Sequence, residues 1–240
     1  MKFFARIAEL FSNKKYILTL LEGLGQTLYI SLCALLIGLV LGMIVAVVKI
    51  AAARNKNLKV FEVVCDIYVM VIRGTPVALQ LFIMAYAIFA IRGFPLAVTA
   101  ILTFGINSGA YVSENIRAGI QSVDIGQTEA GRALGLSFTS TMLKVVVPQA
   151  VKNVIPSIGN EMISLLKETS IVSMVGLVDL TFSAKIIGSG QNMANYLVPM
   201  CVAALFYLVL VYGMTILLKT IEKKLSQSDR KVSVKKKKLN

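Results

Sequence analysis

The sequence contains no histidine, which excludes a histidine metal site and a catalytic triad built on histidine. It also lacks the pattern Gly-x-x-x-x-Gly-Lys-Ser/Thr, so the chain does not bind ATP through a phosphate loop of that kind. The three cysteines, Cys33, Cys65 and Cys201, are far apart, form no CxxC pair and lie in apolar surroundings. That placement is typical of small packing residues. No metal site is expected.

Charge is scarce as well. Charged residues make up 15% of the 240 positions, against about 25% in soluble domains. Hydrophobic residues make up 57% and the mean hydropathy is +0.78. Several apolar runs are long enough to cross a bilayer. The net charge of +13 does not indicate nucleic-acid binding, because the basic residues cluster beside apolar segments and in the C-terminal tail, where they face anionic lipid.

The apolar runs predict an all-α, polytopic membrane protein with five core transmembrane helices. The expected spans are residues 24–48, 58–91, 96–120, 148–178 and 196–218. The second run is longer than the roughly 20 residues that a bilayer requires. It contains Arg73-Gly74-Thr75-Pro76, and since proline removes a helical hydrogen bond, we expect a kink there.

The distribution of lysine and arginine predicts that the N-terminus lies outside and the C-terminus inside the cell. Residues 1–20 form an expected N-terminal amphipathic segment lying on the outer surface, residues 21–220 the transmembrane domain, and residues 221–240 a basic cytoplasmic tail that faces lipid. We expect residues 226–240 of the tail to be disordered. Apolar residues repeat at helical spacing in the N-terminal segment: Phe3, Phe4, Ile7, Leu10 and Phe11.

A polar segment at about residues 121–147 interrupts the apolar runs and is expected to lie in the cytoplasm. Residues 129–136 contain good helix formers, and Gly135 is placed to end that helix. Glu129 would favour the helix dipole and accept backbone hydrogen bonds at the start of the helix, and Pro148 suits the first turn of the next helix. The small residues Ala130, Gly131 and Ala133 would let the backbone of a partner approach closely. An ordinary capped loop between helices has the same local pattern.

The fourth span carries a polar stripe within an arc of roughly 120° at about 100° per residue. The stripe consists of Ser157, Asn160, Glu161, Ser164, Lys167 and Glu168. Because ionisable groups in a span are costly, they indicate function. Glu161 could meet an ammonium or guanidinium group of a solute, and Lys167 a carboxylate. A polar seam between protomers, with lysine–glutamate pairs, remains the alternative.

Polar groups on two other spans add to this set. Thr75 and Gln80 on the second span are further candidates for lining a solute pathway, and the break at Gly74–Pro76 is either a hinge or a static kink. Glu114 and Arg117 stand three residues apart on the third span, so we expect them to form a structural ion pair.

Five motifs together resemble the polar amino acid branch of permease subunits of ATP-binding-cassette (ABC) importers. They are Gly23-Leu-Gly-Gln-Thr27-Leu28, Arg73-Gly-Thr-Pro76 followed by Gln80-Leu-Phe82, Glu114-Asn-Ile-Arg117-Ala-Gly119, Gly126-Gln-Thr-Glu129-Ala-Gly131-Arg-Ala-Leu-Gly135, and Leu166-Lys-Glu-Thr-Ser170. The resemblance runs from about residue 21 to residue 218. The chain departs from the family pattern at Val147, where leucine is usual, and at Gly131, where a second alanine is usual.

The resemblance implies a type I importer permease in a bacterial cell membrane, which works as a homodimer or heterodimer on two ABC ATPase subunits. ATP and Mg would bind to those partners, and an extracellular or periplasmic binding protein would deliver a polar amino acid, more in keeping with a cationic than an acidic one. The chain itself would carry no cofactor and no catalytic residue. The implied ATPase-coupling residues are Glu129, Ala130, Gly131, Ala133, Leu134, Gly135 and Pro148. An integral-membrane enzyme or a passive channel that uses Glu161 and Lys167 is the alternative function.

Overall fold

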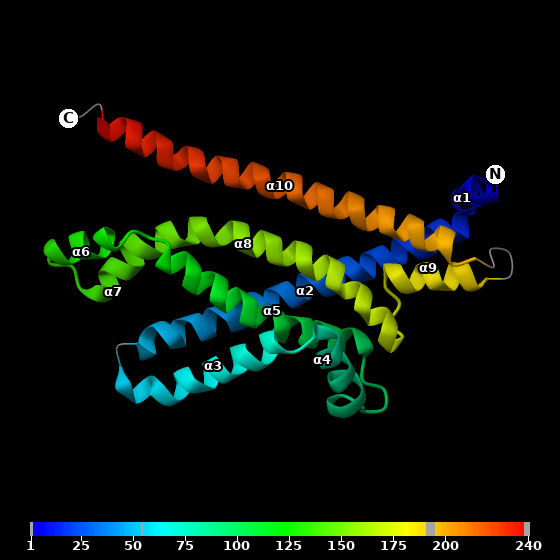
Figure 1. Cartoon of the computed structure of the whole chain (residues 1–240), viewed down its shortest axis with the longest axis horizontal. Helices are drawn as coiled ribbons and strands as arrows, with labels where there is room; N and C mark the ends of the chain where they lie inside the picture. Colours follow the sequence, from blue (N-terminus) through cyan, green and yellow to red (C-terminus); the bar gives the residue numbers. More distant parts are fainter. Residues whose placement is uncertain (1, 54, 191–194, 238–240) are drawn as a thin grey trace.

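A computed structural model describes residues 2–53, 55–190 and 195–237, and every regular element in these ranges is a helix. The long helices run roughly along the long axis of an elongated bundle (Figure 1). The N-terminus and α9 lie at one end of this axis, and α6, α7 and the C-terminal end of α10 lie at the other (Figure 1). The all-α fold class is therefore confirmed.

The first span lies in α2, Lys14–Ala52, which follows the short helix α1, Lys2–Ser12. α2 begins earlier than the predicted start at residue 24, because Asn13 caps it by accepting a hydrogen bond from the backbone N–H of Lys15. α2 packs along α5, Leu96–Gln121, with small residues at the contact. A Cβ at Gly42 would lie 2.6 Å from Val112 Cγ1, so only glycine permits this approach.

The second span is sharply bent, as the sequence predicts. After the short turn η1, Lys56–Leu58, the helix α3, Lys59–Gly74, ends before Pro76. It is followed by α4, Val77–Ile83, and the π-helical turn η2, Met84–Ile88, at an angle of 105° to the first half. Because Pro76 has no N–H to continue the helix, the chain turns there. The third span, α5, matches the predicted residues 96–120 closely.

The predicted fourth span is part of a longer run of helical elements. This run comprises α7, Phe138–Thr141, the π-helical turn η3, Met142–Val146, α8, Val147–Glu168, and the 3-10 helix η4, Thr169–Val175. A separate helix that the sequence did not predict, α9, Leu180–Ser189, follows at 46°. The fifth span lies in α10, Leu197–Lys237. Among the residues that the structure describes, three helices are long and apolar enough to cross a membrane, and the number rises to 5 if each bent pair counts as one span.

Two terminal expectations have different outcomes. The helical form of the N-terminal segment is confirmed, with Leu10 buried and Phe4 and Phe11 exposed, while the side chain of Phe3 lies outside the described residues. The disorder expected for residues 226–240 is wrong for 226–237, which continue α10, and residues 238–240 lie outside the described residues. The physical reason is that a helix already formed in the membrane extends without a new nucleation cost.

The largest apolar core lies between α2, α4, α5 and α8. It includes Ile30, Leu81, Phe104 and Leu165, all of which are fully buried. Both halves of the bent second span and the polar stripe of α8 are thus positioned around α5.

Candidate functional site

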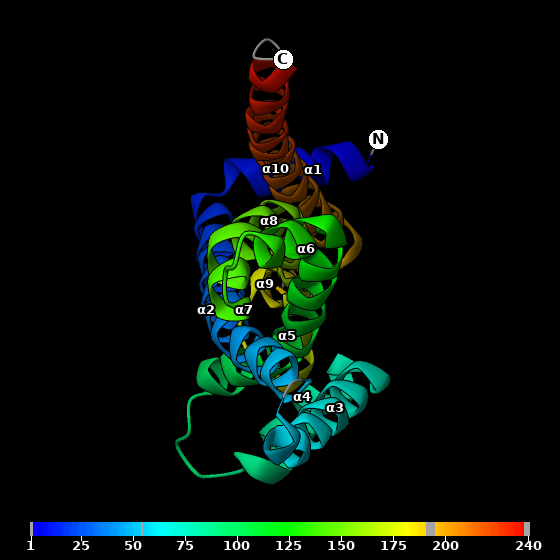
Figure 2. The ribbon, with the colours of Figure 1, turned by 90° about the vertical axis from the view of Figure 1, so that its left-hand side faces the viewer.

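The segment between α5 and α8 protrudes at one end of the molecule. It contains α6, Ile125–Ala133, and α7, and both lie beyond the main bundle (Figures 1 and 2). Leu134 and Ile125 expose 82% and 74% of their surface, and Glu129, Ala130, Ala133 and Gly135 are also exposed. An apolar, exposed tip on a short polar segment is suited to docking against another protein. We call residues 121–147 the protruding segment.

The end of α6 is fixed by Gly135. Its φ is +76°, in the left-handed region, and the N–H groups of Gly135 and Leu136 donate to the carbonyl oxygens of Arg132 and Gly131 at 2.9 and 3.1 Å. These two hydrogen bonds form a complete Schellman motif. The predicted helix stop at Gly135 is therefore confirmed.

The start of α6 differs from the prediction. Asp124 caps it, with its carboxylate oxygen accepting a hydrogen bond of 2.7 Å from the backbone N–H of Gly126. Glu129 lies in the second turn and forms no hydrogen bond or ion pair with any residue that the structure describes. The capping role expected for Glu129 is wrong, since the helix begins before it, and its carboxylate is left for contact with water or a partner.

Gly131 faces the chain's own α7 and not an outside partner. A Cβ at this position would lie 2.6 Å from Thr141 Cγ2. Gly131 is buried, whereas Ala130 and Ala133 are exposed. The expectation that Gly131 admits a partner backbone is therefore wrong, because α6 and α7 fold against each other at this residue. Ala130 and Ala133 keep the surface position that the prediction requires.

Pro148 lies in the first turn of α8, as predicted, and is exposed. The helix does not begin there, however, because α8 continues directly from η3. In this wide turn the N–H of Val147 donates to the carbonyl oxygen of Met142, five residues back. Proline is tolerated at this point because the regular hydrogen-bond pattern is already interrupted.

The polar stripe of α8 is separated from the apolar side of that helix. Leu165, Leu166 and Thr169 are fully buried, and Ile158 and Met162 pack against the core. On the stripe, Asn160 and Lys167 are exposed, and the remaining members are half-buried: Ser157, Glu161, Ser164 and Glu168. The stripe therefore borders the main core, and only Asn160 and Lys167 face outwards. Its role as solute pathway or protomer seam stays a prediction.

Glu161 projects towards α5, where Ser108 lies close to its carboxylate. The hydroxyl oxygen of Ser108 is fully buried, yet it has no hydrogen-bond partner of acceptable geometry among the described residues. A carboxylate and an unsatisfied hydroxyl thus lie near each other between α5 and α8. Such a pair could accept from and donate to a solute.

Thr75 and Gln80 are both engaged at the bend of the second span. Gln80 Nε2 donates to the carbonyl oxygen of Ile72 and to Thr75 Oγ1, both at 2.8 Å, and Asn107 Nδ2 donates to Gln80 Oε1 at 3.0 Å. Thr75 Oγ1 donates to the carbonyl oxygen of Val71 at 2.8 Å. Both residues also line a largely apolar hollow of about 220 Å³. Their polar atoms brace the bend, and their place in a pathway stays a prediction.

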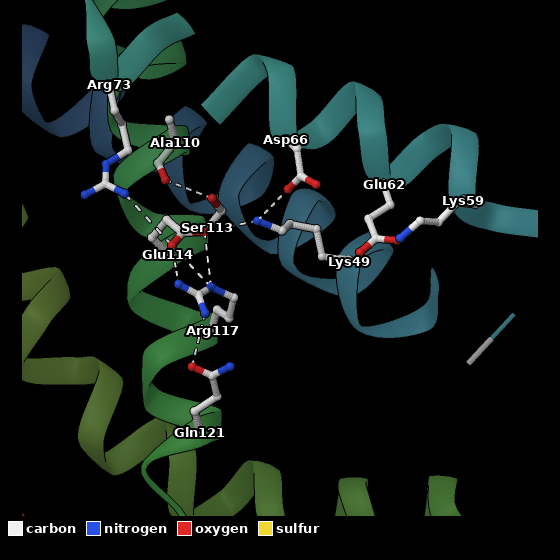
Figure 3. A network of polar contacts seen from close by, with 10 residues as sticks. All are labelled: Lys49, Lys59, Glu62, Asp66, Arg73, Ala110, Ser113, Glu114, Arg117 and Gln121. Atoms are coloured by element: carbon white, nitrogen blue, oxygen red, sulfur yellow. Dashed lines mark hydrogen bonds and ion pairs between the residues drawn. The ribbon is translucent and has the colours of Figure 1, made fainter. Parts of the chain in front are cut away.

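An ionic network joins α2, α3 and α5 around Glu114 (Figure 3). The predicted pair with Arg117 is confirmed, with 2.6 Å between Glu114 Oε2 and Arg117 Nη2. Lys49 Nζ lies 3.2 Å from Glu114 Oε1 and 3.0 Å from Asp66 Oδ1, and Arg73 Nη1 lies 3.9 Å from Glu114 Oε2. The sequence analysis missed Lys49, Asp66 and Arg73 as members. The spacing of Asp66 and Arg73, seven residues apart on one helix face, was the available signal.

Comparisons with known proteins extend over most of the chain. Residues 24–227 match the family described as "Binding-protein-dependent transport system inner membrane component". The "Arginine transport system permease protein ArtQ" of Bacillus subtilis (strain 168) is 41% identical over 212 residues, covering 88% of this chain and 94% of that protein. The "L-cystine transport system permease protein TcyB" of the same organism is 35% identical over 208 residues, covering 85% and 87%. A structure described as "Crystal structure of an amino acid ABC transporter with histidines" has a TM-score of 0.81 and 38% identity, covering 90% of this chain and 98% of that chain.

Proposed function

The chain belongs to the family of binding-protein-dependent transport system inner membrane components, and from this premise we propose that it is the permease subunit of an ATP-driven importer of polar amino acids. The relatives support the solute class, since arginine and L-cystine appear in the names of two of them and each aligns over more than four-fifths of this chain. The alternatives, an integral-membrane enzyme or a passive channel, are not favoured by these relationships.

The protruding segment of each permease protomer is the proposed docking site for one of the two ABC ATPase subunits. Its exposed tip at Ile125, Glu129 and Leu134 supports this role, and the absence of a phosphate loop means that ATP and Mg would be held by the partners. ATP-driven closure of the ATPase subunits would move α6 and α7. Because α7, η3 and α8 are continuous, that movement would reach the polar stripe directly.

Transport would proceed by alternating access in a dimer of permease subunits, in which the stripes of two protomers face a shared pathway. A binding protein would deliver the solute from outside the cell. The distribution of lysine and arginine supports an outer N-terminus and an inner C-terminus. Glu161 on the stripe supports a cationic solute over an acidic one, because like charge at a partly desolvated site is costly.

The observation that carries this proposal is an alignment of 41% identity that covers nearly the whole of both chains. The experiment is uptake of labelled arginine, glutamine and L-cystine into proteoliposomes that contain the chain with its ATPase and binding protein. Uptake should require ATP and all three components. Equally fast uptake by the purified chain alone, or uptake in the absence of ATP, would contradict the proposal and favour a passive channel.

A further inference from the structure

Arg73 is the cation that lies farthest from a carboxylate in the ionic network. Its guanidinium lies 3.9 Å from Glu114 Oε2 and 5.1 Å from the centre of the Tyr111 ring. Over the part of the chain that the structure describes, it donates no hydrogen bond, although a guanidinium has five N–H donors. The side chain is 43% exposed. Arg73 therefore presents unused donors at the surface of this subunit.

The ending of α3 does not account for Arg73. A basic residue in the last turn of a helix often stabilises the terminal carbonyl groups. Here Thr75 Oγ1 donates to the carbonyl oxygen of Val71, and Gln80 Nε2 donates to those of Ile72 and Thr75 at 2.8 and 3.2 Å. These carbonyl groups are thus satisfied without the guanidinium.

The network does not require Arg73 for its charge balance either. Glu114 Oε1 accepts from Lys49, and Glu114 accepts from Arg117 at 2.6 to 3.3 Å. Lys49 and Arg117 already neutralise Asp66 and Glu114 as a group of two cations and two carboxylates. Arg73 adds a surplus positive charge, and it approaches Glu114 from the side opposite Lys49 (Figure 3).

A guanidinium without an acceptor in a membrane domain is costly, and its fork of donors matches a carboxylate in two parallel hydrogen bonds. We propose that Arg73 binds the α-carboxylate of the transported amino acid. This assignment rests on the proposed function and adds a specificity-determining residue to it. Tyr111 and Glu114 hold the guanidinium in place, and the solute supplies the missing acceptor.

The position of Glu161 provides a second contact for the same solute. The carboxylate of Glu161 faces Ser108 on α5, whereas Arg73 contacts Glu114 on that helix. Six residues of helix separate these two levels, about 9 Å at 1.5 Å per residue. An extended arginine spans about 7 Å from its carboxylate to its guanidinium, given bonds of about 1.5 Å. Along the axis of α5, this separation is comparable to the length of a long cationic amino acid, whose distal cation would meet Glu161 while its carboxylate meets Arg73.

The test measures direct binding of labelled solutes to the permease–ATPase complex in nanodiscs. The binding protein is left out, because it would impose its own selectivity. The probes are labelled arginine and glutamine, each compared with the amine that remains after loss of its carboxylate. Arg73→Gln should weaken binding of the amino acid about 10- to 100-fold, since a charge-assisted pair is lost. The affinity of the Arg73→Gln variant for the amine should equal that of the wild type. Arg73→Lys, which keeps the charge but not the fork, should fall between.

Arg92→Gln is the matched control, because it removes an exposed arginine between α4 and α5 that takes part in no ion pair with the other described residues. It should leave both affinities unchanged. Measurements in nanodiscs with and without anionic lipid show whether the Arg73 guanidinium binds a lipid phosphate or the solute carboxylate. A loss in Arg73→Gln that appears only with anionic lipid would assign the guanidinium to lipid and overturn the proposal.

Three further results would overturn it. Equal weakening of amino acid and amine in both Arg73 variants would show a structural role. Unchanged binding of both probes would show no role in solute recognition. If the wild-type complex bound no probe although it carried out ATP-driven uptake, the permease would have no solute-binding site at Arg73. Absence of ATP-driven uptake of amino acids by the wild-type system would instead contradict the proposed function.

Discussion

Replacing Gly135 by alanine tests whether the protruding segment must be ordered to dock an ATPase. Gly135 ends α6 with φ +76°, a conformation that glycine adopts freely and that other residues adopt at a cost. A Cβ built on Gly135 has no heavy atom within 4 Å, so alanine introduces no clash. The substitution therefore tests backbone strain without a change in packing, because Gly135 is exposed.

The strain sets the expected magnitude. The left-handed conformation costs a non-glycine residue about 1–2 kcal/mol. The Schellman hydrogen bonds of Gly135 and Leu136 give the segment its ordered form, and the strained chain adopts that form less often. If docking requires the ordered form, and the strained chain in the free state is mostly not in that form, the whole strain appears as lost affinity. Since 1.4 kcal/mol corresponds to a factor of ten, ATPase affinity should fall by up to about 5- to 30-fold.

The assay is the affinity of the nanodisc-embedded permease for its ATPase subunit, together with ATP-driven uptake. Gly135→Asn should be milder than Gly135→Ala, because asparagine tolerates the left-handed region better. Gly213→Ala is the control, since Gly213 lies within α10 and its Cβ also meets nothing within 4 Å. Alanine there should leave docking unchanged. Wild-type affinity in Gly135→Ala, or an asparagine variant weaker than the alanine variant, would refute the reasoning.

Three other substitutions test separate parts of the structure. Gly131→Ala should destabilise the contact between α6 and α7 by about 1–3 kcal/mol through overpacking, because the new Cβ would lie 2.6 Å from Thr141 Cγ2. The variant should therefore bind the ATPase more weakly, and adding Thr141→Ala should restore part of the lost affinity. No recovery in the double variant would count against the contact. Glu114→Gln should lower the free energy of unfolding by up to about 3 kcal/mol, because Glu114 pairs with both Lys49 and Arg117. Glu62→Gln should lower it by less than about 1 kcal/mol, because Glu62 pairs, among the described residues, only with Lys59, whose side chain is 69% exposed. Equal melting temperatures of the two variants would contradict this. Glu161→Gln should weaken uptake of arginine more than that of glutamine in competition assays, and unchanged kinetics for both would place Glu161 in a structural seam.

Local rules explain the elements that the sequence predicts well. The bend at Pro76 follows from a missing N–H, and the end of α6 follows from a glycine that can adopt a positive φ. The bounds of α5 follow from an apolar run whose ends coincide with Pro95 and Ser122. Each of these features depends on residues adjacent in the sequence, so one chain without relatives is sufficient to place it.

The sequence predicts less well the features that depend on contacts between helices. Gly131 and Ala130 look alike as small residues in the sequence, but only the packing of α6 on α7 decides that Gly131 is buried. The capping residue of α6 was misplaced because Asp124 begins the helix one turn before Glu129. Sequence spacing gave the pair of Glu114 and Arg117, but Lys49 lies 65 residues from Glu114, and no local pattern joins them.

The polar residues of the membrane domain fall into two groups that only the fold separates. Thr75, Gln80 and Asn107 satisfy one another and the backbone at the bend, so a solute would have to displace an existing hydrogen bond to reach them. Arg73 and Ser108 have donors without an acceptor among the described residues. An unmet donor in a medium of low dielectric gains more from a solute than a satisfied one does. Solute contacts should therefore be sought first at Arg73 and beside Ser108, where Glu161 supplies the complementary charge.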